Sequence, residues 1–451
     1  MESLGSTLSF AYCIPFAGML LSIAICPLVN GAWWEKFKGA AVLFWSLLFL
    51  VPFAIGNGAG TALNHFLEVI LGDYISFIVL LFGLFCVAGN IRIRGTLAGT
   101  PKVNVLLLLI GTLLSSWVGT TGASMLLIRP VIRANSWRKR KVHTMVFFTP
   151  SPQSCIIHLS ISILSVGDPP LLMGFMHGVP FTWSFHLLPV FLLNVVLLLA
   201  LYFIIDSRAY KKDLSDGAKP KASEKTEKIG LEGAHNLIFL LCIVGAVILS
   251  GSLANINAFF GNGIKIEGEV TLTFATMIEM AIILLSAFLS FKTTKKEVRT
   301  ANNFSWGAIQ EVAVLFIGIF ITMIPALLIL SARGSELGIT KNWQMFWATG
   351  ALSSFLDNTP TYLVFFETAV SLHATNEAIG SVMIPQTMLM AISCGAVFMG
   401  ANTYIGNAPN FMIKSIAEEN NIKMPSFFGY LFWSVCCLIP VFLIDTLIFF
   451  L

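Results

Sequence analysis

The chain has 451 residues, of which 56% are hydrophobic and 11% are charged, and its formal net charge is +4. This composition excludes a soluble globular domain, and the continuous apolar runs exclude an outer-membrane barrel, whose strands alternate polar and apolar residues. The sequence contains no metalloprotease motif, phosphate-binding loop or nucleophile–histidine pairing, so we expect no enzyme. It predicts an all-α polytopic membrane protein, because helices satisfy their own backbone groups in lipid.

Ten apolar segments have about the 20 residues that a helix needs to cross a bilayer. They lie at 8–29, 38–56, 68–90, 143–165, 184–205, 235–257, 271–291, 306–331, 383–400 and 427–451. Two further apolar segments, 102–128 and 342–367, are interrupted in the middle by polar residues, Gly and Pro. Non-helical backbone at membrane depth is tolerated only against protein or a water-filled cavity. We therefore expect both segments to be re-entrant hairpins.

Basic residues predict the orientation of the chain in the membrane. With the N-terminus outside, the inner loops contain all of the 27 Lys and Arg except Lys265, Arg333 and Lys341. This distribution obeys the positive-inside rule for the inner (plasma) membrane of a cell. Both termini then lie outside, and the polar segment 206–234 is a flexible cytoplasmic linker. We interpret the basic run 138–141 as an anchor for lipid headgroups.

The two hairpins indicate an internal repeat. The Ser-Ser pair at 115–116 recurs at 353–354. The Gly-Asp-Pro sequence at 167–169 has a counterpart in Gly-Asn-Ala at 406–408, and the two pairs of motifs are separated by nearly the same number of residues. Each half has five spans and one hairpin, and an odd number of spans inserts the second half upside down. The halves are 1–205 and 235–451. Paired interruptions in two inverted halves are the sequence pattern of a secondary-transporter binding site.

The strongest candidate site is the tip of the second hairpin. Asp357 lies there beside Asn358, Thr359 and Thr361, within an apolar neighbourhood. A carboxyl group in such a place can hold a proton or, once ionised, a Na⁺ ion with the neighbouring oxygens as ligands. The alternative is a structural Asp357 that caps the second arm of the hairpin.

Other polar residues at the interruptions complete the candidate ion and substrate site. They are Gly119, Thr120, Thr121 and Ser124 at the first tip, and Asp168, Asn402, Thr403 and Asn407 at the breaks in two spans. Small residues at the first tip also suit helix packing, and Asp168 before a proline also suits a helix cap. Both of these structural alternatives stay open at this point.

Three ionisable residues inside spans are candidates for a proton relay. Glu279 lies mid-span, Glu311 lies near the inner end of its span, and His158 is central to the span at 143–165. A buried, unpaired carboxyl group is costly, which favours a function for Glu279. For His158, a hydrogen-bonded packing role is the stronger interpretation.

Long motifs in the chain resemble the ion transporter superfamily. The runs are Gly-Thr-Thr-Gly-Ala-Ser-Met-Leu-Leu-Ile-Arg-Pro at 119–130 and Ser-Ser-Phe-Leu-Asp-Asn-Thr-Pro-Thr at 353–361. They are similar to NhaD-type sodium/proton antiporters and to a sister branch named for citrate transport. The segments 400–412 and 304–320 look like that sister branch in particular.

The resemblance implies a homodimer whose protomers have a scaffold part and a mobile part that moves as an elevator. Relatives that carry di- and tricarboxylates have Ser-Asn-Thr at both hairpin tips, whereas this chain has Gly-Thr-Thr and Asp-Asn-Thr. The leading expectation is therefore Na⁺/H⁺ antiport, with Na⁺ at Asp357, Asn358, Thr120 and Thr121. The alternative is a Na⁺-coupled carrier of citrate or a dicarboxylate. We expect no cofactor, and the transported ions are Na⁺ and H⁺.

Overall fold

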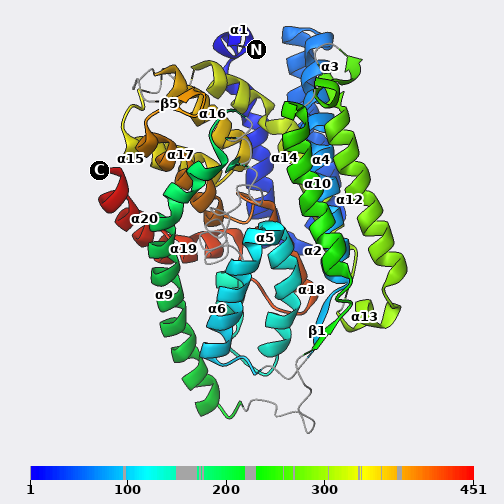
Figure 1. Ribbon diagram of the computed structural model, residues 1–451, viewed down its shortest axis with the longest axis vertical. Coiled ribbons are helices and arrows are strands. Elements are labelled where there is room, and N and C mark those ends of the chain that lie inside the picture. Colours follow the sequence, from blue (N-terminus) through cyan, green and yellow to red (C-terminus); the bar gives the residue numbers. More distant parts are fainter. Residues whose placement is uncertain are drawn as a thin grey trace.

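The structure is a computed structural model, and it is mostly helical (Figure 1). It describes the chain apart from residues 1, 95–97, 149–169, 172–173, 175–176, 219–229, 257, 268–269, 303, 334–335, 337, 357 and 373–377. The described helices are α1 (Glu2–Thr7), α2 (Ile14–Asn57), α3 (Ala59–Leu67), α4 (Ile75–Gly89), α5 (Pro101–Ala134), α6 (Val142–Phe148), α9 (Leu188–Ser215), α10 (Asn236–Ile256), α11 (Ala258–Gly261), α12 (Phe274–Thr293), α13 (Lys296–Ala301), α14 (Gly307–Arg333), α15 (Asn342–Ser353), α16 (Asn358–Ser371), α17 (Gln386–Met399), α18 (Ala408–Glu419), α19 (Phe427–Cys437) and α20 (Ile439–Asp445).

Short elements join these helices. Segments of 3₁₀ helix lie at η1 (Phe10–Cys13), η4 (Phe181–Leu187) and η6 (Gly400–Asn402), and π-helical segments lie at η2 (Glu68–Tyr74) and η7 (Thr446–Phe450). Three antiparallel pairs of strands join β1 (Arg92–Arg94) to β2 (Gly230–Glu232), β3 (Gly263–Glu267) to β4 (Val270–Thr273), and β5 (Ala378–Ile379) to β6 (Val382–Met383).

The helices form two groups in Figure 1. One group contains α4, α10, α12 and α14, which run side by side, with α2 packed against α14. The other group contains α5, α6, α9, α15, α16, α17, α19 and α20. Helix α18 contacts α14 of the first group and α5 of the second, so it lies where the groups meet.

Helix α2 contains the first two predicted spans, which are folded against each other. Asn30 has non-helical backbone angles (φ −153°, ψ 89°) and separates two helical arms. The indole Nε1 of Trp45 donates to Ser22 Oγ at 2.9 Å across the arms. A sharp turn at Asn30 therefore returns the chain, as the predicted inner loop requires.

Helix α5 is also folded back on itself, as predicted for the hairpin at 102–128. Asn104 and Asn135, which are 31 residues apart, exchange amide hydrogen bonds of 3.0 and 2.9 Å. The N–H of Gly99 donates to the carbonyl of Ala134 at 2.9 Å. A straight helix would separate Asn104 from Asn135 by about 46 Å, so its two arms must meet at the base.

Helices α15 and α16 lie within the second predicted hairpin and pack against each other, with α15 ending at Ser353 and α16 beginning at Asn358. Both arms pack against α17. Gly395 of α17 allows the closest approach, because a Cβ atom there would lie 2.5 Å from the carbonyl oxygen of Phe346 on α15. The predicted break in the following span is also present, since helix ends at Met399 and resumes only at Ala408.

The described residues contain seven helices long and apolar enough to cross a membrane. They match seven of the ten predicted spans, and α10 and α17 match two more. The span predicted at 143–165 lies mostly outside the described residues. Helix α9 continues to Ser215, beyond the predicted start of the linker at 206. Its last turns carry Asp206 and Asp213, which are buried and therefore keep this segment folded against the protein.

Candidate functional site

The tip of the second hairpin and the break in the next span lie directly against each other. We call this contact the hairpin–break junction and define it as residues 353–356, 358 and 400–407. A Cβ atom on Gly406 would lie 2.8 Å from the backbone oxygens of Ser353 and Ser354, and one on Gly400 would lie 2.2 Å from the side-chain amide of Asn358. Only glycine leaves room at these two positions, so backbone carbonyls and polar side chains converge there.

The two serines of the tip bind the backbone of α17. The hydroxyl of Ser353 donates to the carbonyl of Ala396. The hydroxyl of Ser354 lies 2.9 Å from the carbonyl of Met399 and accepts a hydrogen bond of 3.0 Å from Asn402 Nδ2. Both serines are buried. These bonds hold the end of α15 against the last turn of α17.

Thr403 connects the tip to the irregular backbone of the break. Its hydroxyl donates to the carbonyl of Ser354. The same oxygen accepts from the N–H groups of Ile405 (3.3 Å) and Gly406 (3.0 Å). Backbone groups outside a helix need partners when they are buried, and this one side chain supplies three of those bonds.

Asn358 begins the second arm of the hairpin and reaches across the junction. Its Nδ2 donates to the carbonyls of Ala396 at 3.1 Å and Gly406 at 3.0 Å. The side chain is buried, with 4% of its surface exposed. The amide therefore links the hairpin to both sides of the break.

Two amide oxygens at the break have no donor within the described chain. They are Asn402 Oδ1 and Asn410 Oδ1, on residues that are 7% and 0% exposed. The Nδ2 atom of Asn410 is used, since it donates to the carbonyls of Gly400 (3.1 Å) and Thr403 (2.9 Å). Leaving a buried acceptor unsatisfied costs about 1–3 kcal/mol. Oxygens left free in this way are suited to a hard cation such as Na⁺.

The structure brings together three residues that the sequence singled out. Asn358, Asn402 and Thr403 belong to the junction, and Thr361 is fully buried in the first turn of α16. Asn407 precedes α18, is half-buried, and its side chain does not cap that helix. Ser124 is buried in the second arm of α5.

Several predicted site residues lie outside what the structure describes. Asp357, Asp168 and His158 are not described at all. The helical backbone at Gly119, Thr120, Thr121 and Thr359 is described, but their side chains are not. The roles predicted for these residues stay predictions.

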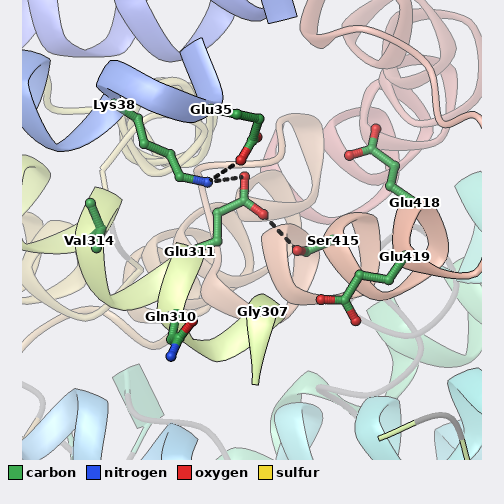
Figure 2. A pocket seen from close by; sticks show the side chains of 9 residues that line it. All are labelled: Glu35, Lys38, Gly307, Gln310, Glu311, Val314, Ser415, Glu418 and Glu419. Carbon is green, nitrogen blue, oxygen red and sulfur yellow. Dashed lines mark hydrogen bonds and ion pairs between the residues drawn. The ribbon is translucent and has the colours of Figure 1, made fainter. Parts of the chain in front are cut away.

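Two relay candidates lie away from the junction. Glu279 is on α12, in the group formed with α4, α10 and α14, and bonds Ser250 of α10. Glu311 lines a cavity of about 500 Å³ between α2, α14 and α18 (Figure 2). Its carboxylate accepts from Ser415 Oγ at 2.7 Å and lies 3.8 Å from Lys38 Nζ. Glu311 therefore links the two groups of helices rather than contacting the tip.

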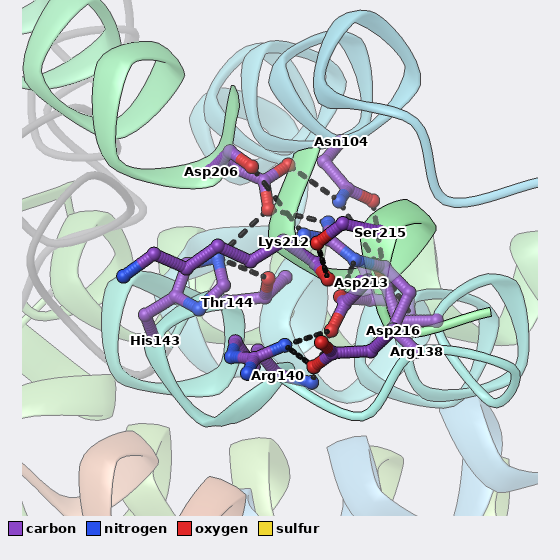
Figure 3. A network of polar contacts seen from close by, with 12 residues as sticks. Asn104, Arg138, Arg140, His143, Thr144, Asp206, Lys212, Asp213, Ser215 and Asp216 are labelled. Atoms are coloured by element: carbon purple, nitrogen blue, oxygen red, sulfur yellow. Dashed lines mark hydrogen bonds and ion pairs between the residues drawn. The ribbon is translucent and has the colours of Figure 1, made fainter. Parts of the chain in front are cut away.

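The basic run at 138–141 is not simply an anchor for lipid headgroups. The side chain of Arg138 is fully buried and pairs with Asp206 and, at 3.0 Å, with Asp213 of α9 (Figure 3). The interpretation as a headgroup anchor is therefore wrong for Arg138. The error arose because its acidic partners, Asp206 and Asp213, were assigned to a flexible linker rather than to a helix. Arg140 is more exposed, and its hydrogen bond lowers the pKa of the Asp216 carboxyl.

The same network reaches the base of the first hairpin. Asn104 Nδ2 donates to Asp206 at 2.9 Å, and His143 Nε2 lies 2.7 Å from the other carboxylate oxygen. We call Asn104, Asn135, Arg138, His143, Asp206 and Asp213 the base network. It ties both arms of α5 to the end of α9.

Sequence reasoning missed three contributors to this architecture. Ser353 and Ser354 were recognised as part of the internal repeat and of the motif at 353–361 but not as site residues, although hydroxyls beside a chain reversal are typical ligands of backbone carbonyls. Asn410 was overlooked because it is a single polar residue among apolar ones. In the sequence, its position directly after Pro409 was the signal that could have identified it.

Comparison with known proteins gives one assignment. The family model described as “Putative citrate transport” matches residues 5–450, which is nearly the whole chain. No curated protein matches the sequence significantly. The chain is therefore a multi-pass membrane protein that belongs to the transporter family described as “Putative citrate transport”.

Proposed function

We propose that the protein is a secondary active transporter in which Na⁺ binding at the hairpin–break junction drives movement of a citrate-like carboxylate. The junction carries this proposal, because buried hydroxyl, amide and backbone groups converge there and two amide oxygens have no donor in the described chain. The family description supports the choice of a citrate-like cargo over a second cation.

We assign Na⁺ to the two hairpin tips. Its proposed ligands are Asp357 and Asn358 from the second tip and Thr120 and Thr121 from the first. Gly119, Ser124, Thr359 and Thr361 complete the surroundings. The burial of Asn358 and Thr361 supports this assignment, because a cation there exchanges its water shell for protein oxygens.

The carboxylate is proposed to bind between the tips and the breaks. Asn407 is well placed to donate to it, because its side chain is not used as a helix cap. The first N–H groups of α18 add donors and a partial positive charge for an anion. Asp168 occupies the matched position in the first half.

Na⁺/H⁺ antiport is the second candidate, favoured by the carboxyl group that the sequence places at the tip. Na⁺ and H⁺ would compete there for Asp357, with Glu279, His158 and Glu311 as relay candidates. In both cases we propose that the hairpins and breaks move as one body against the scaffold helices. The homodimer and the outside location of both termini are part of the proposal.

Purified protein in liposomes with a trapped pH dye separates the two candidates. Labelled citrate should accumulate only when an inward Na⁺ gradient is present, and Asp357→Asn should abolish that accumulation. If NaCl alone dissipates an imposed pH gradient and citrate does not enter, the antiport candidate replaces the carboxylate carrier. If neither response is seen in active, folded protein, Na⁺ coupling is wrong.

A further inference from the structure

A second carboxyl group is buried in the last span, far along the chain from the hairpins. Asp445 ends α20 and none of its surface is exposed. Val190 and Val195 of α9 and Phe442 of α20 belong to one buried apolar cluster around this part of the fold. A carboxyl group in such surroundings is costly unless it is paired or protonated.

Among the residues that the structure describes, Asp445 has one hydrogen-bond partner, Asn194 of α9. Asn194 Nδ2 donates to Asp445 Oδ2 at 2.9 Å and to the carbonyl of Val190 at 2.8 Å. Within the described residues, the other carboxyl oxygen, Asp445 Oδ1, has no donor, and neither has Asn194 Oδ1. No Lys, Arg or His within the described residues forms an ion pair with this carboxyl group.

One additional proton improves this arrangement in two ways. Placed on the carboxyl group, it removes a buried negative charge that a single amide bond compensates poorly. It also turns an acceptor-only group into a donor, in a pair that otherwise has two acceptors without a donor. Acid and amide groups have complementary donors and acceptors, whereas a carboxylate and an amide oxygen do not.

Titratable groups on the surrounding helices do not supply an alternative counter-charge. In α9, charged residues begin at Asp206, twelve residues or about 18 Å beyond Asn194. Helix α15 has no titratable residue. Those of α17 and α19 are Cys394, Tyr430, Cys436 and Cys437, which are neutral near pH 7.

The environment of Asp445 is connected to the hairpin through α15. The indole Nε1 of Trp347 donates to Oγ1 of Thr446, the residue after Asp445, at 3.0 Å. The rings of Phe346 and Phe450 lie 4.7 Å apart. Helix α15 ends at Ser353 in the junction, so movement of this arm changes the packing around Asp445 and the proposed cation site together.

We propose that Asp445 is a proton-binding site that links transport to H⁺, with Asn194 as its positioning residue. In the conformation described here Asp445 holds a proton on its carboxyl group. When movement of α15 admits water, the O–H bond breaks, the proton passes to water, and a carboxylate remains. Rebinding of H⁺ from the opposite side completes the cycle. This inference rests on the proposed function only in that the protein is a transporter.

The first test is thermal unfolding of the purified protein between about pH 6 and about pH 9. If the folded chain holds a proton that the unfolded chain has released, folding takes up a proton and stability falls as pH rises. The wild-type Tm should therefore fall over this range, and Asp445→Asn, which mimics the protonated form, should flatten the dependence. The control Glu297→Gln changes an exposed carboxyl group of α13 and should behave as wild type.

The second test measures proton movement and citrate uptake in the same liposomes. Na⁺-dependent citrate uptake by the wild type should respond to an imposed pH gradient, and uptake by Asp445→Asn should lose that response. Identical pH dependence of Tm in wild type and Asp445→Asn would overturn the inference. The inference would also be overturned if Na⁺ stabilised the wild type but not Asp445→Asn, because that result would make Asp445 a cation ligand.

The outcomes separate this inference from the proposed function. If Na⁺-driven citrate uptake is present but never responds to pH, the proposed function stands and the proton site is wrong. If no variant transports, the unfolding measurement still decides whether Asp445 holds a proton.

Discussion

At the scale of single residues, Thr403 is the side chain on which the break most depends. Its hydroxyl makes three hydrogen bonds, one to the carbonyl of Ser354 and two from backbone N–H groups of the break. Val has nearly the same shape as Thr and no hydroxyl. Thr403→Val should therefore leave buried backbone groups unsatisfied, at about 1–3 kcal/mol each, and reduce citrate uptake strongly.

The matched control for this prediction is Thr293→Val. The hydroxyl of Thr293 is exposed, donates to a carbonyl of its own helix and lies 3.1 Å from His235 Nε2. Neither contact involves the break, so uptake and Tm should stay close to wild type. Labelled-citrate uptake and thermal unfolding are the measurements. A Thr403→Val protein with normal uptake would show that the break keeps its shape without this hydroxyl.

The residues recognised from sequence share one property. Asn358, Asn402 and Thr403 are polar residues beside Gly or Pro within apolar runs, which marks an interruption. Asp445 and Asn194 lack that context, and each is an isolated polar residue in a regular helix. Their partnership joins positions 251 residues apart, which no local pattern encodes.

At the scale of secondary-structure elements, the crossing of α15 and α17 determines how closely the hairpin approaches the break. A Cβ atom on Gly395 would lie 2.5 Å from the backbone oxygen of Phe346, and backbone cannot move aside as a flexible side chain can. Gly395→Ala should therefore separate the two helices, lower Tm and reduce uptake.

Gly245→Ala in α10 provides a control of the same chemistry. No atom lies within 4 Å of a Cβ built on Gly245, and Ala favours a helix over Gly by about 1 kcal/mol. Its Tm should be unchanged or raised. Equal behaviour of the two variants in thermal unfolding would mean that α15 and α17 are not held at the described separation.

The base network should stabilise the first hairpin through Arg138. Arg138→Met removes the charge that faces the fully buried carboxylates of Asp206 and Asp213. Breaking one partner of a buried pair costs about 3–5 kcal/mol, so thermal stability in detergent should fall sharply. Lys139→Met, which changes the exposed neighbour, should have little effect. Comparable Tm values for the two variants would contradict this role.

The positions of the hairpins could be predicted because each is interrupted by a short run of polar residues, Gly or Pro. The hydrogen bonds that join the two arms could not be predicted, because they connect residues far apart in the sequence. The Gly-Thr-Thr-Gly and Asp-Asn-Thr-Pro sequences mark the turns. The Asn104–Asn135 pair at the base depends on the arms being already folded. The end of α9 was misjudged because Asp206 and Asp213, read alone, are typical of a solvated linker.

At the scale of the whole molecule, Glu311 and Ser415 connect the two groups of helices at the cavity of Figure 2. If α18 moves with the hairpins during transport, this contact must break in each cycle. A double variant, Glu311→Cys with Ser415→Cys in a background lacking the eight native cysteines, should stop citrate uptake when oxidised. Reduction should restore it.

Each single cysteine variant is the control, and oxidation should leave its uptake unchanged. Mass spectrometry of the oxidised double variant establishes that the cross-link has formed. Continued uptake by fully cross-linked protein would show that α14 and α18 move together, and the proposed elevator motion would need a different boundary.

The base network also has a consequence for biosynthesis. Arg138 leaves the ribosome 68 residues before Asp206 and 75 before Asp213, its two acidic partners. Until α9 has been synthesised, the arginine has no counter-charge from that helix, and the first hairpin cannot settle in its final position. Translation that stops between these positions should therefore release a chain recognised by quality-control proteases, whereas a chain extended through Asp213 should be protected.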